Sequence, residues 1–395
     1  MAVREIKKDI YAVGALDWDR RLFDELIPLP DGTSYNAYLV KGSEKTVLLD
    51  TVDPAKGQEL RDHLRALNVD KIDYIVAHHG EQDHSGTIPE ILELYPEAVV
   101  LTNEKCSAIL QDLLHIPAAK FRVVQDEETV SLGDKTLKFI FTPWVHWPET
   151  MVTYLPEDKI LFSCDFFSSH LAAGELFARG QSNTYSAAKR FFSEIMMPFR
   201  AAIRSNLKRL ENLDIEMIAP SHGPVYDHPA IILDAYREWS DEAKVKNEGV
   251  IIYVSMHGST EKMVRVLTDA LIKRGVNVKP FRLTVTDTGE LAAALVDAAT
   301  LVVASPAVLG GPHPQVAYAA MLAAALRPRA KFAAIIGSYG WGSKMVEQLG
   351  GLLGGLKAEL LEPVLAKGHP REEHLAALDA LAAQIAQRHK SIGTQ

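Results

Sequence analysis

The chain has 395 residues, a formal net charge of −9 and 24% charged residues. This length exceeds what one ordinary core serves, so two domains are expected, and the dispersed acidic charge argues against a nucleic-acid surface. No apolar run reaches the length of a membrane span, and the N-terminal sequence lacks a secretory signal. The two cysteines, Cys106 and Cys164, form no CxxC pair, which is typical of a reducing compartment. We therefore expect a soluble cytoplasmic protein.

The first part of the chain is predicted to consist mainly of short strands joined by turns. "SYNAYLV" and "KTVLLDTVD" flank the turn "KGSE" as a hairpin, and the helix "PAKGQELRDHLRALN" follows them. The strand "KIDYIVAHH" comes next, and "AVVLTN", "FRVVQ", "LKFIFTP", "MVTYLP" and "KILFSCD" are further strands. One long helical stretch covers roughly 184–213, and "IEMIAPSHGPV" forms a final strand and turn.

The second part alternates strands with helices. The predicted strands are "GVIIYVS", "VNVKPFRL", "TLVVASP", "KFAAIIGS" and "AELLEPVLA", and each is followed by a helical pattern. Such alternation predicts a parallel sheet covered on both faces. The polar stretch "REWSDEAKVKNEG" separates the two parts. We place the domains at 1–248 and 249–395.

A cluster of potential metal ligands lies in "HHGEQDHSG", directly after a predicted strand. Three later segments, each strand-like, also end in a ligand type: "FTPWVHWPE", "KILFSCDFF" and "IAPSHGPV". One such residue alone is more often structural, and His78, His170 and His228 are set aside for that reason. The repeated strand-end placement predicts a metal site instead. Its seven candidate ligands are His79, Glu81, Asp83, His84, His146, Asp165 and His222.

The neighbours of these ligands are open to two interpretations. Trp147 follows His146 and either shields the site or packs in the core. Cys164 precedes Asp165, and strand alternation predicts that its thiol points to the opposite face, as a buried apolar group.

The pattern HxExDH, followed by His146, Asp165 and His222, resembles the metallo-β-lactamase-like domain, an αββα sandwich. Hydrolases of that fold carry HxHxDH, whereas Glu81 in the second position is similar to the flavodiiron proteins. Four imidazoles and three carboxylates without a thiolate also suit iron or manganese better than structural zinc. The resemblance implies one iron held by His79, Glu81 and His146, a second held by Asp83, His84 and His222, and a bridging Asp165. It implies catalytic roles for Glu81, Asp165 and Trp147.

Three strand-end loops of the second part predict a mononucleotide site. "VSMHGSTEKM" presents backbone N–H groups and hydroxyls at a helix N-terminus, although Ser259 could simply cap the helix. "SPAVLGGPHP" and "GSYGWGSK" lie on the same sheet edge, and the loops resemble those of short-chain flavodoxins that bind FMN. The predicted FMN contacts are Ser255, Met256, His257, Gly258, Ser259, Thr260, Ser305, Pro306, Ala307, Val308, Leu309, Gly310, Gly311, Ser338, Tyr339, Gly340, Trp341 and Gly342.

The complete expectation is an α/β protein with an N-terminal metallo-β-lactamase-like sandwich followed by a flavodoxin-like doubly wound parallel sheet. The resemblance implies an oxidoreductase that reduces dioxygen to water, nitric oxide to nitrous oxide, or both, with two irons and FMN. It also implies an external electron donor such as rubredoxin, and a head-to-tail homodimer or a tetramer built from it. The sequence departs from relatives at Phe191 and Phe192, where tyrosines are frequent, and has no histidine in 15–32.

Two other readings compete with this one. A dizinc hydrolase fused to a flavodoxin domain would use a metal-activated hydroxide, but Glu81 and the flavin loops argue against it. A pure electron carrier with a degenerate metal site is opposed by the complete ligand set.

Overall fold

The computed structural model describes residues 3–394, which divide into two compact units. The first runs to Phe192 and resumes over Phe199–Arg237, and the second comprises Ser193–Pro198 and the residues from Glu238 onward. This division falls inside helix α7 (Ala230–Ser240). The first strand of the second unit, β17 (Lys246–Tyr253), begins three residues before the predicted start at Gly249. The domain boundary at 248/249 itself stays a prediction.

The first unit is a sandwich of two sheets. Sheet one has seven strands in the order β1 (Arg4–Lys7), β2 (Ile10–Ala12), β7 (Tyr38–Lys41), β8 (Thr46–Leu49), β9 (Tyr74–Val76), β10 (Val99–Thr102) and β11 (Phe121–Val123). Sheet two has five strands in the order β12 (Thr129–Ser131), β13 (Thr136–Phe141), β14 (Met151–Leu155), β15 (Ile160–Cys164) and β16 (Met217–Pro220). Alternate side chains of both sheets, such as Val47 and Leu49 opposite Phe139 and Phe162, share one core.

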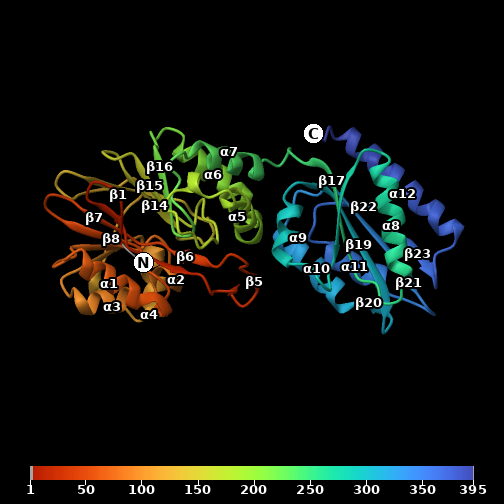
Figure 1. The fold of residues 1–395 in the computed structure, drawn as a ribbon, viewed down its shortest axis with the longest axis horizontal. Helices are drawn as coiled ribbons and strands as arrows, with labels where there is room; N and C mark the ends of the chain where they lie inside the picture. The colour runs from red at the N-terminus through yellow and green to blue at the C-terminus, as the bar shows by residue number, and fades with distance from the viewer. Residues whose placement is uncertain (1–2, 395) are drawn as a thin grey trace. The chain divides into compact units, whose positions relative to one another are not determined.

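Helices cover the outer faces of this sandwich (Figure 1). Helices α1 (Gly57–Ala66), α3 (Ile88–Leu94) and α4 (Glu104–Leu114) pack on sheet one through a second apolar cluster that includes Leu60, Ile91 and Leu110. On the side of sheet two lie α5 (Thr184–Phe191), α6 (Arg200–Leu210) and α7, and the first two of these replace the single long helix that the sequence predicted over roughly 184–213. A π-helical segment, Phe192–Met196, and a 3₁₀ turn, Met197–Phe199, interrupt that helix. Pro198 lies in this turn, and a proline cannot continue the hydrogen-bond ladder.

The second unit is the predicted doubly wound sheet. Its parallel strands lie in the order β18 (Asn277–Arg282), β17, β19 (Ala298–Val308) and β21 (Phe332–Tyr339), and both β22 (Glu359–Leu360) and β23 (Val364–Lys367) pair with β21. The sequence predicted one continuous last strand, but it is split, with Pro363 lying directly before β23. Helices α8 (Ser259–Ile272) and α12 (Glu372–Ser391) cover one face, and α9 (Thr288–Leu295), α10 (Pro314–Leu326) and α11 (Met345–Leu353) lie on the other (Figure 1).

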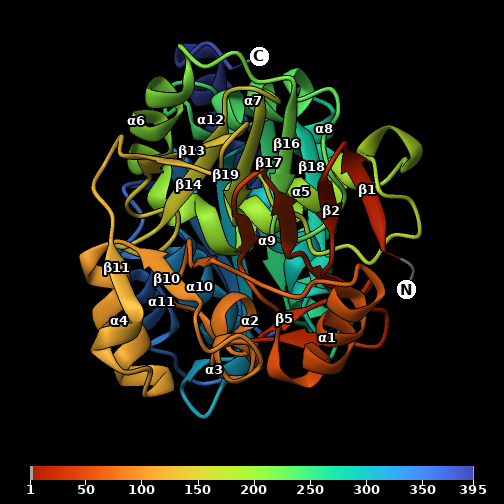
Figure 2. The same ribbon diagram turned by 90° about the vertical axis from the view of Figure 1, so that its left-hand side faces the viewer.

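Two strand pairs in the first unit stand apart from its main sheets. β3 (Ala15–Asp17) pairs with β6 (Thr33–Tyr35), and β4 (Leu22–Phe23) pairs with β5 (Ile27–Pro28). Figure 2 turns the view so that this unit, which includes the short helix α2 (Gln82–Ser85), faces the reader. Among the described residues, no helix is long and apolar enough to cross a membrane.

Candidate metal centre and cofactor crevice

The seven predicted metal ligands converge at one end of the sandwich. His79 follows β9 of sheet one, and the short helix α2 carries Asp83 and His84, with Glu81 as the residue before its first turn. Sheet two contributes the other three from consecutive strands, because His146 precedes β14, Asp165 follows β15 and His222 follows β16. Adjacent strand ends of facing sheets therefore bring together residues that are far apart in sequence.

The donor atoms form two groups whose members lie within 4.8 Å of one another. In the first, Glu81 Oε2 is 3.1 Å from His79 Nε2 and 3.3 Å from His146 Nε2. In the second, Asp83 Oδ1 is 3.2 Å from His84 Nε2, and Oδ2 is 3.2 Å from His222 Nε2. All seven sequence-predicted residues thus belong to one of these groups.

Asp165 contacts both groups, one with each carboxylate oxygen. Oδ2 lies 3.3 Å from His146 Nε2, and Oδ1 lies 3.2 Å from His84 Nε2 and 3.4 Å from His222 Nε2. A carboxylate placed in this way has the disposition of a bridge between two cations.

The buried atoms of the cluster fit a metal-binding role. Among the described residues, both carboxylate oxygens of Asp83 and Asp165, and Nε2 of His84, are buried and contact one another and the other histidines without a well-formed hydrogen bond. Such atoms cost roughly 1–3 kcal/mol each when left unpaired, and more when charged. Two cations at the centre would satisfy all five atoms, and the set of nitrogen and oxygen donors suits iron.

The cluster is electrostatically coupled. Burial alone lowers the pKa of His222, but Asp165 and Asp83 raise it to about 10, and Asp165 and Glu81 likewise raise the pKa of His146 to about 9. Burial raises the pKa of the Asp165 carboxyl, yet the surrounding histidines outweigh burial and hold it well below its usual range. The Asp165 carboxylate is therefore held ionised, which is the form that binds a cation.

Partners on the far side of two histidines fix the orientation of their rings. Nδ1 of His79 lies 2.7 Å from Glu149 Oε1, and Nδ1 of His222 lies 2.6 Å from the carbonyl oxygen of Ser34. Both contacts leave Nε2 directed at the cluster, as in carboxylate–histidine–metal arrangements. Sequence reasoning missed Glu149. The only signal for it is a carboxylate three residues after His146.

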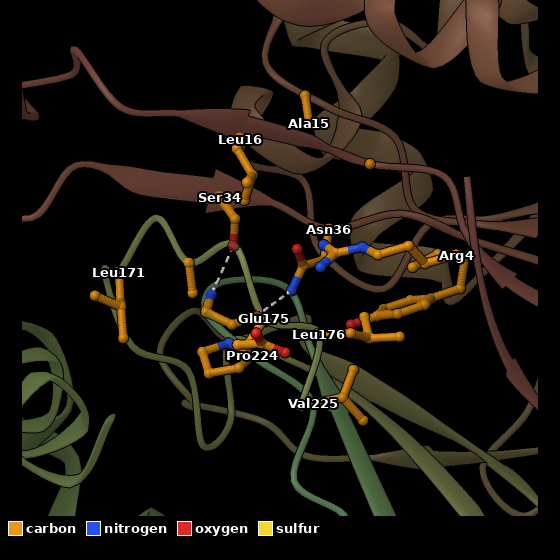
Figure 3. Close-up of a pocket in the computed structure, with 15 residues that line it drawn as sticks. Arg4, Ala15, Leu16, Ser34, Asn36, Leu171, Glu175, Leu176, Pro224 and Val225 are labelled. Carbon is orange, nitrogen blue, oxygen red and sulfur yellow. Dashed lines mark hydrogen bonds between the residues drawn. The ribbon is translucent and has the colours of Figure 1, made fainter. Parts of the chain in front are cut away.

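Two polar side chains fix the turn that carries His222 by hydrogen bonds to its backbone (Figure 3). Ser34 Oγ accepts a hydrogen bond of 2.7 Å from Gly223 N, and Asn36 Nδ2 donates to Gly223 O and Pro220 O at 2.7 and 2.8 Å. Gly223 has φ +83°, and a Cβ there would collide with Ser169 Oγ. The turn therefore requires glycine.

Aromatic side chains surround the centre. The Trp147 ring lies edge-on to His79 at 4.8 Å between centroids and is partly exposed, which favours shielding over a core role. His170, set aside from sequence, packs at 4.9 Å against each of Phe23, Phe191 and His222. Its Nδ1 contacts Thr33 Oγ1 at 2.9 Å, whereas its buried Nε2 has no partner.

The alternation argument for Cys164 was wrong in one respect. The residue is buried as predicted, but its φ of 52° ends the strand pattern, and the thiol lies within 4.8 Å of donor atoms of His84 and Asp165. Burial raises the pKa of this thiol well above its ordinary value.

The second unit carries a cavity of about 170 Å³ at the carboxyl edge of its sheet. Three of its walls come from the predicted loops, and ten of the predicted contacts line it: Ser255, Met256, His257, Ser259, Thr260, Pro306, Ala307, Ser338, Tyr339 and Gly340. A Cβ added to the lining residue Gly340 would meet nothing within 4 Å, so the backbone there is open to a ligand. The cavity thus fits a mononucleotide at the N-terminus of α8.

The remaining predicted contacts do not line this cavity. Ser305 lies inside β19, which continues to Val308 before a tight turn into β20 (Gly311–Pro312). Leu309 at that turn and Trp341 are almost fully exposed, at 101% and 91%. The residues outside the cavity are Gly258, Ser305, Val308, Leu309, Gly310, Gly311, Trp341 and Gly342. One lining residue, Gly368, was not predicted from sequence.

A β-lactamase-like sandwich with a two-group ligand cluster, followed by a flavodoxin-like unit, defines the class of protein. Residues 33–223 match the model of the ODP family beta lactamases. The chain is 36% identical to a nitric oxide reductase from Moorella thermoacetica over 97% of this chain and 98% of that protein. Its fold matches the rubredoxin oxygen:oxidoreductase of Desulfovibrio gigas with a TM-score of 0.95 at 31% identity over 99% of both chains. It also matches the flavodiiron protein of Giardia intestinalis with a TM-score of 0.94 at 28% identity over 99% of this chain and 98% of that one.

The chain belongs to the flavodiiron protein family. It is an oxidoreductase of that family, and the fold expected from the sequence is confirmed in both units.

Proposed function

We propose that the protein reduces dioxygen to water, nitric oxide to nitrous oxide, or both, at a diiron centre supplied with electrons through FMN. The observation that carries this proposal is Asp165, whose two carboxylate oxygens are divided between the two donor groups. The cavity of the second unit favours a redox reaction over hydrolysis, because it would hold a flavin and hydrolysis requires no electron carrier.

The seven proposed ligands divide the roles at the centre. His79, Glu81 and His146 would hold one iron, Asp83, His84 and His222 the other, and Asp165 would bridge. Bound iron would supply electrons and open positions for the gas, and bound FMN would pass electrons on one or two at a time. Glu81 and Asp165 are proposed as catalytic because they would contact both the bound irons and the reacting gas.

The surrounding residues orient and shield the site. Glu149 and the Ser34 carbonyl hold the rings of His79 and His222, so that little reorganisation is needed when metal binds. Trp147, Phe23 and Phe191 present hydrocarbon next to the histidines and exclude water. An apolar surrounding suits an apolar diatomic gas and protects the reduced centre from side reactions.

Two measurements test this function. Metal analysis of protein grown in iron-replete medium should give two irons per chain, and anaerobic single turnover of the reduced protein should consume dioxygen, nitric oxide or both. Stoichiometric zinc with little iron, together with thioester or phosphodiester cleavage, would instead establish the dizinc hydrolase.

We further infer an external electron donor and a head-to-tail homodimer. One relative is named for rubredoxin, which supports a small rubredoxin as the donor. In the dimer, the FMN of one subunit would serve the diiron centre of its partner, and two-fold symmetry creates two such pairs. Mixing an Asp165→Asn variant with a flavin-site variant should then restore up to roughly half of the activity per dimer. No recovery after verified subunit exchange would show that electrons stay within one chain.

A further inference from the structure

The loop after β23 forms a fourth wall of the cofactor cavity. β23 pairs with β21 in parallel as far as Tyr339 and Lys367, and Gly368 N then donates a hydrogen bond of 2.8 Å to Tyr339 O. Gly368 lines the cavity, and its φ of +75° turns the chain back toward α8. This geometry brings the next residue, His369, to the first turn of α8.

His369 lies between a lysine and a serine of that turn. Its Nε2 is 3.4 Å from Lys262 Nζ, and its Nδ1 is 3.4 Å from Ser259 Oγ. An ammonium group can only donate, so Nε2 must accept and Nδ1–H must donate to Ser259. The tautomer of the imidazole is thereby fixed by its two neighbours.

This chain of contacts determines the direction of the Ser259 hydroxyl. Because Ser259 Oγ accepts from His369, its own proton is free to donate elsewhere. Within residues 3–394, the Ser259 hydroxyl makes no other side-chain hydrogen bond, and Ser259 lines the cavity. The hydroxyl therefore has one unused donor at the cavity wall.

The charge at this point is unfavourable without an anion. Lys262 lies in the first turn of α8, where the helix dipole presents its positive end. The neighbouring carboxylate does not compensate, because Glu261 Oε1 is engaged by Arg265 Nη2 at 2.6 Å. The residue that precedes the helix, Gly258, offers no side-chain cap either. A phosphate bound in the cavity would relieve this excess of positive charge.

We propose that Lys262 and His369 form a hydrogen-bond chain that aims the Ser259 hydroxyl at the phosphate of the flavin. Through this chain of hydrogen bonds, the loop after β23 makes the cavity bind FMN, which carries a phosphate, more tightly than riboflavin, which does not. His369 and Lys262 act as positioning residues, and Ser259 is the group that contacts the phosphate. The inference rests on the proposed binding of FMN and adds to it a residue from a fourth loop.

Flavin titrations of the apoprotein test the inference directly. FMN and riboflavin are each titrated into the full-length apoprotein, and binding is followed by quenching of flavin fluorescence. His369→Ala should weaken FMN binding roughly 10- to 100-fold, the range of a hydrogen bond to a charged group, and leave riboflavin binding unchanged. His369→Gln should restore most of the FMN affinity, because an amide can accept from Lys262 and donate to Ser259 at once.

Matched controls separate this role from a general effect on the fold. Lys273 lies at the other end of the same helix, directly after Ile272, and Lys273→Ala should leave both affinities unchanged. In a Ser259→Ala background, His369→Ala should cost little further FMN affinity, because His369 acts through Ser259. Inorganic phosphate should compete with FMN less well in His369→Ala than in the wild type.

Three results would overturn the inference. Equal losses of FMN and riboflavin in His369→Ala would assign His369 a structural role, and unchanged FMN affinity would assign it none. Additive losses in the double variant would likewise remove the link through Ser259. Failure of the wild-type apoprotein to bind FMN is a separate outcome, which would contradict the proposed function itself.

Discussion

The metal centre and the flavin cavity are built in different ways. The centre consists of side chains, nearly all of them buried, whose donor atoms converge from both sheets of the sandwich. The cavity is lined largely by loop residues, with open space at Gly340, while Leu309 and Trp341 in the same loops lie outside it and are exposed. A side-chain site is specified by residue type, whereas a backbone site is specified by conformation, which many sequences can adopt.

This difference explains what the sequence could predict. The ligand types recur after strand-like segments, so all seven members of the centre are recognisable from the sequence, and the structure brings them together. Glu149 was not predicted, because only the fold brings its carboxylate, 70 residues along the chain, into contact with His79. The cavity was predicted less sharply, since strand β19 extends through Ser305 to Val308, and the loop after β23 that carries His369 was not among the loops predicted to bind the flavin.

The two sites also differ in how buried polar atoms are satisfied. At the centre, the described residues give the oxygens of Asp83 and Asp165 no well-formed hydrogen bond, only ion-pair contacts with the histidines of the cluster. In the second unit, the buried His389 is paired on both ring nitrogens, with Asn247 Oδ1 at 2.8 Å and Thr300 Oγ1 at 2.7 Å. Unpaired buried atoms therefore indicate a ligand, and paired ones indicate a structural role.

The largest effect is expected from removing the carboxylate shared by both donor groups. Asp165→Asn should abolish stoichiometric iron binding, with a loss of affinity beyond the roughly 10- to 100-fold that is typical of outer partners. FMN content should be unchanged, because the two sites are built independently. Metal analysis and flavin absorbance of the same sample measure both, with the exposed Asp214→Asn as the control. Full iron content in Asp165→Asn would contradict the bridging role.

The buried His389 should make the stability of the second unit, and not of the first, depend on pH. Burial lowers the pKa of His389 to about 4, from an ordinary value of 6.5. Between pH 6.5 and pH 4, His389 is therefore protonated in the unfolded chain but neutral in the folded one. Its contribution to the free energy of unfolding is complete above pH 6.5 and is lost progressively toward pH 4. At pH 5 the loss is about 2 kcal/mol, since each pH unit contributes about 1.4 kcal/mol.

Hydrogen–deuterium exchange of β17 and β19 in the full-length protein measures this effect. Protection, corrected for intrinsic exchange rates, should fall between pH 6.5 and 5 in the wild type and fall less in His389→Gln. An identical pH dependence in the two proteins would assign the acid sensitivity to other groups.

A smaller effect is expected from the partner of His79. Glu149→Gln keeps the size of the side chain but removes the charge opposite Nδ1 of His79. Iron affinity should fall roughly 10- to 100-fold, measured by competition with a chelator. Glu104→Gln, at an exposed neighbouring position, is the control and should leave the affinity unchanged. A Glu149→Gln variant with wild-type affinity would show that the hydrogen bond alone, without the charge, suffices to hold the ring.

The smallest expected effect is a difference in flavin affinity between substitutions at two aromatic residues of the same loop. The sequence predicted both Tyr339 and Trp341 as FMN contacts, and each has a ring that could stack on the flavin, but only Tyr339 lines the cavity. An aromatic contact contributes about 0.5–1.5 kcal/mol beyond its buried area, which corresponds to roughly 2- to 13-fold in affinity. Tyr339→Ala should therefore weaken both FMN and riboflavin by about that factor, because the ring is common to the two flavins. Trp341→Ala should weaken neither in a single chain, since its side chain is 91% exposed. A larger loss for Trp341→Ala than for Tyr339→Ala would mean that the loop closes over the flavin when it binds, and that the backbone of this site is less fixed than the side chains of the metal centre.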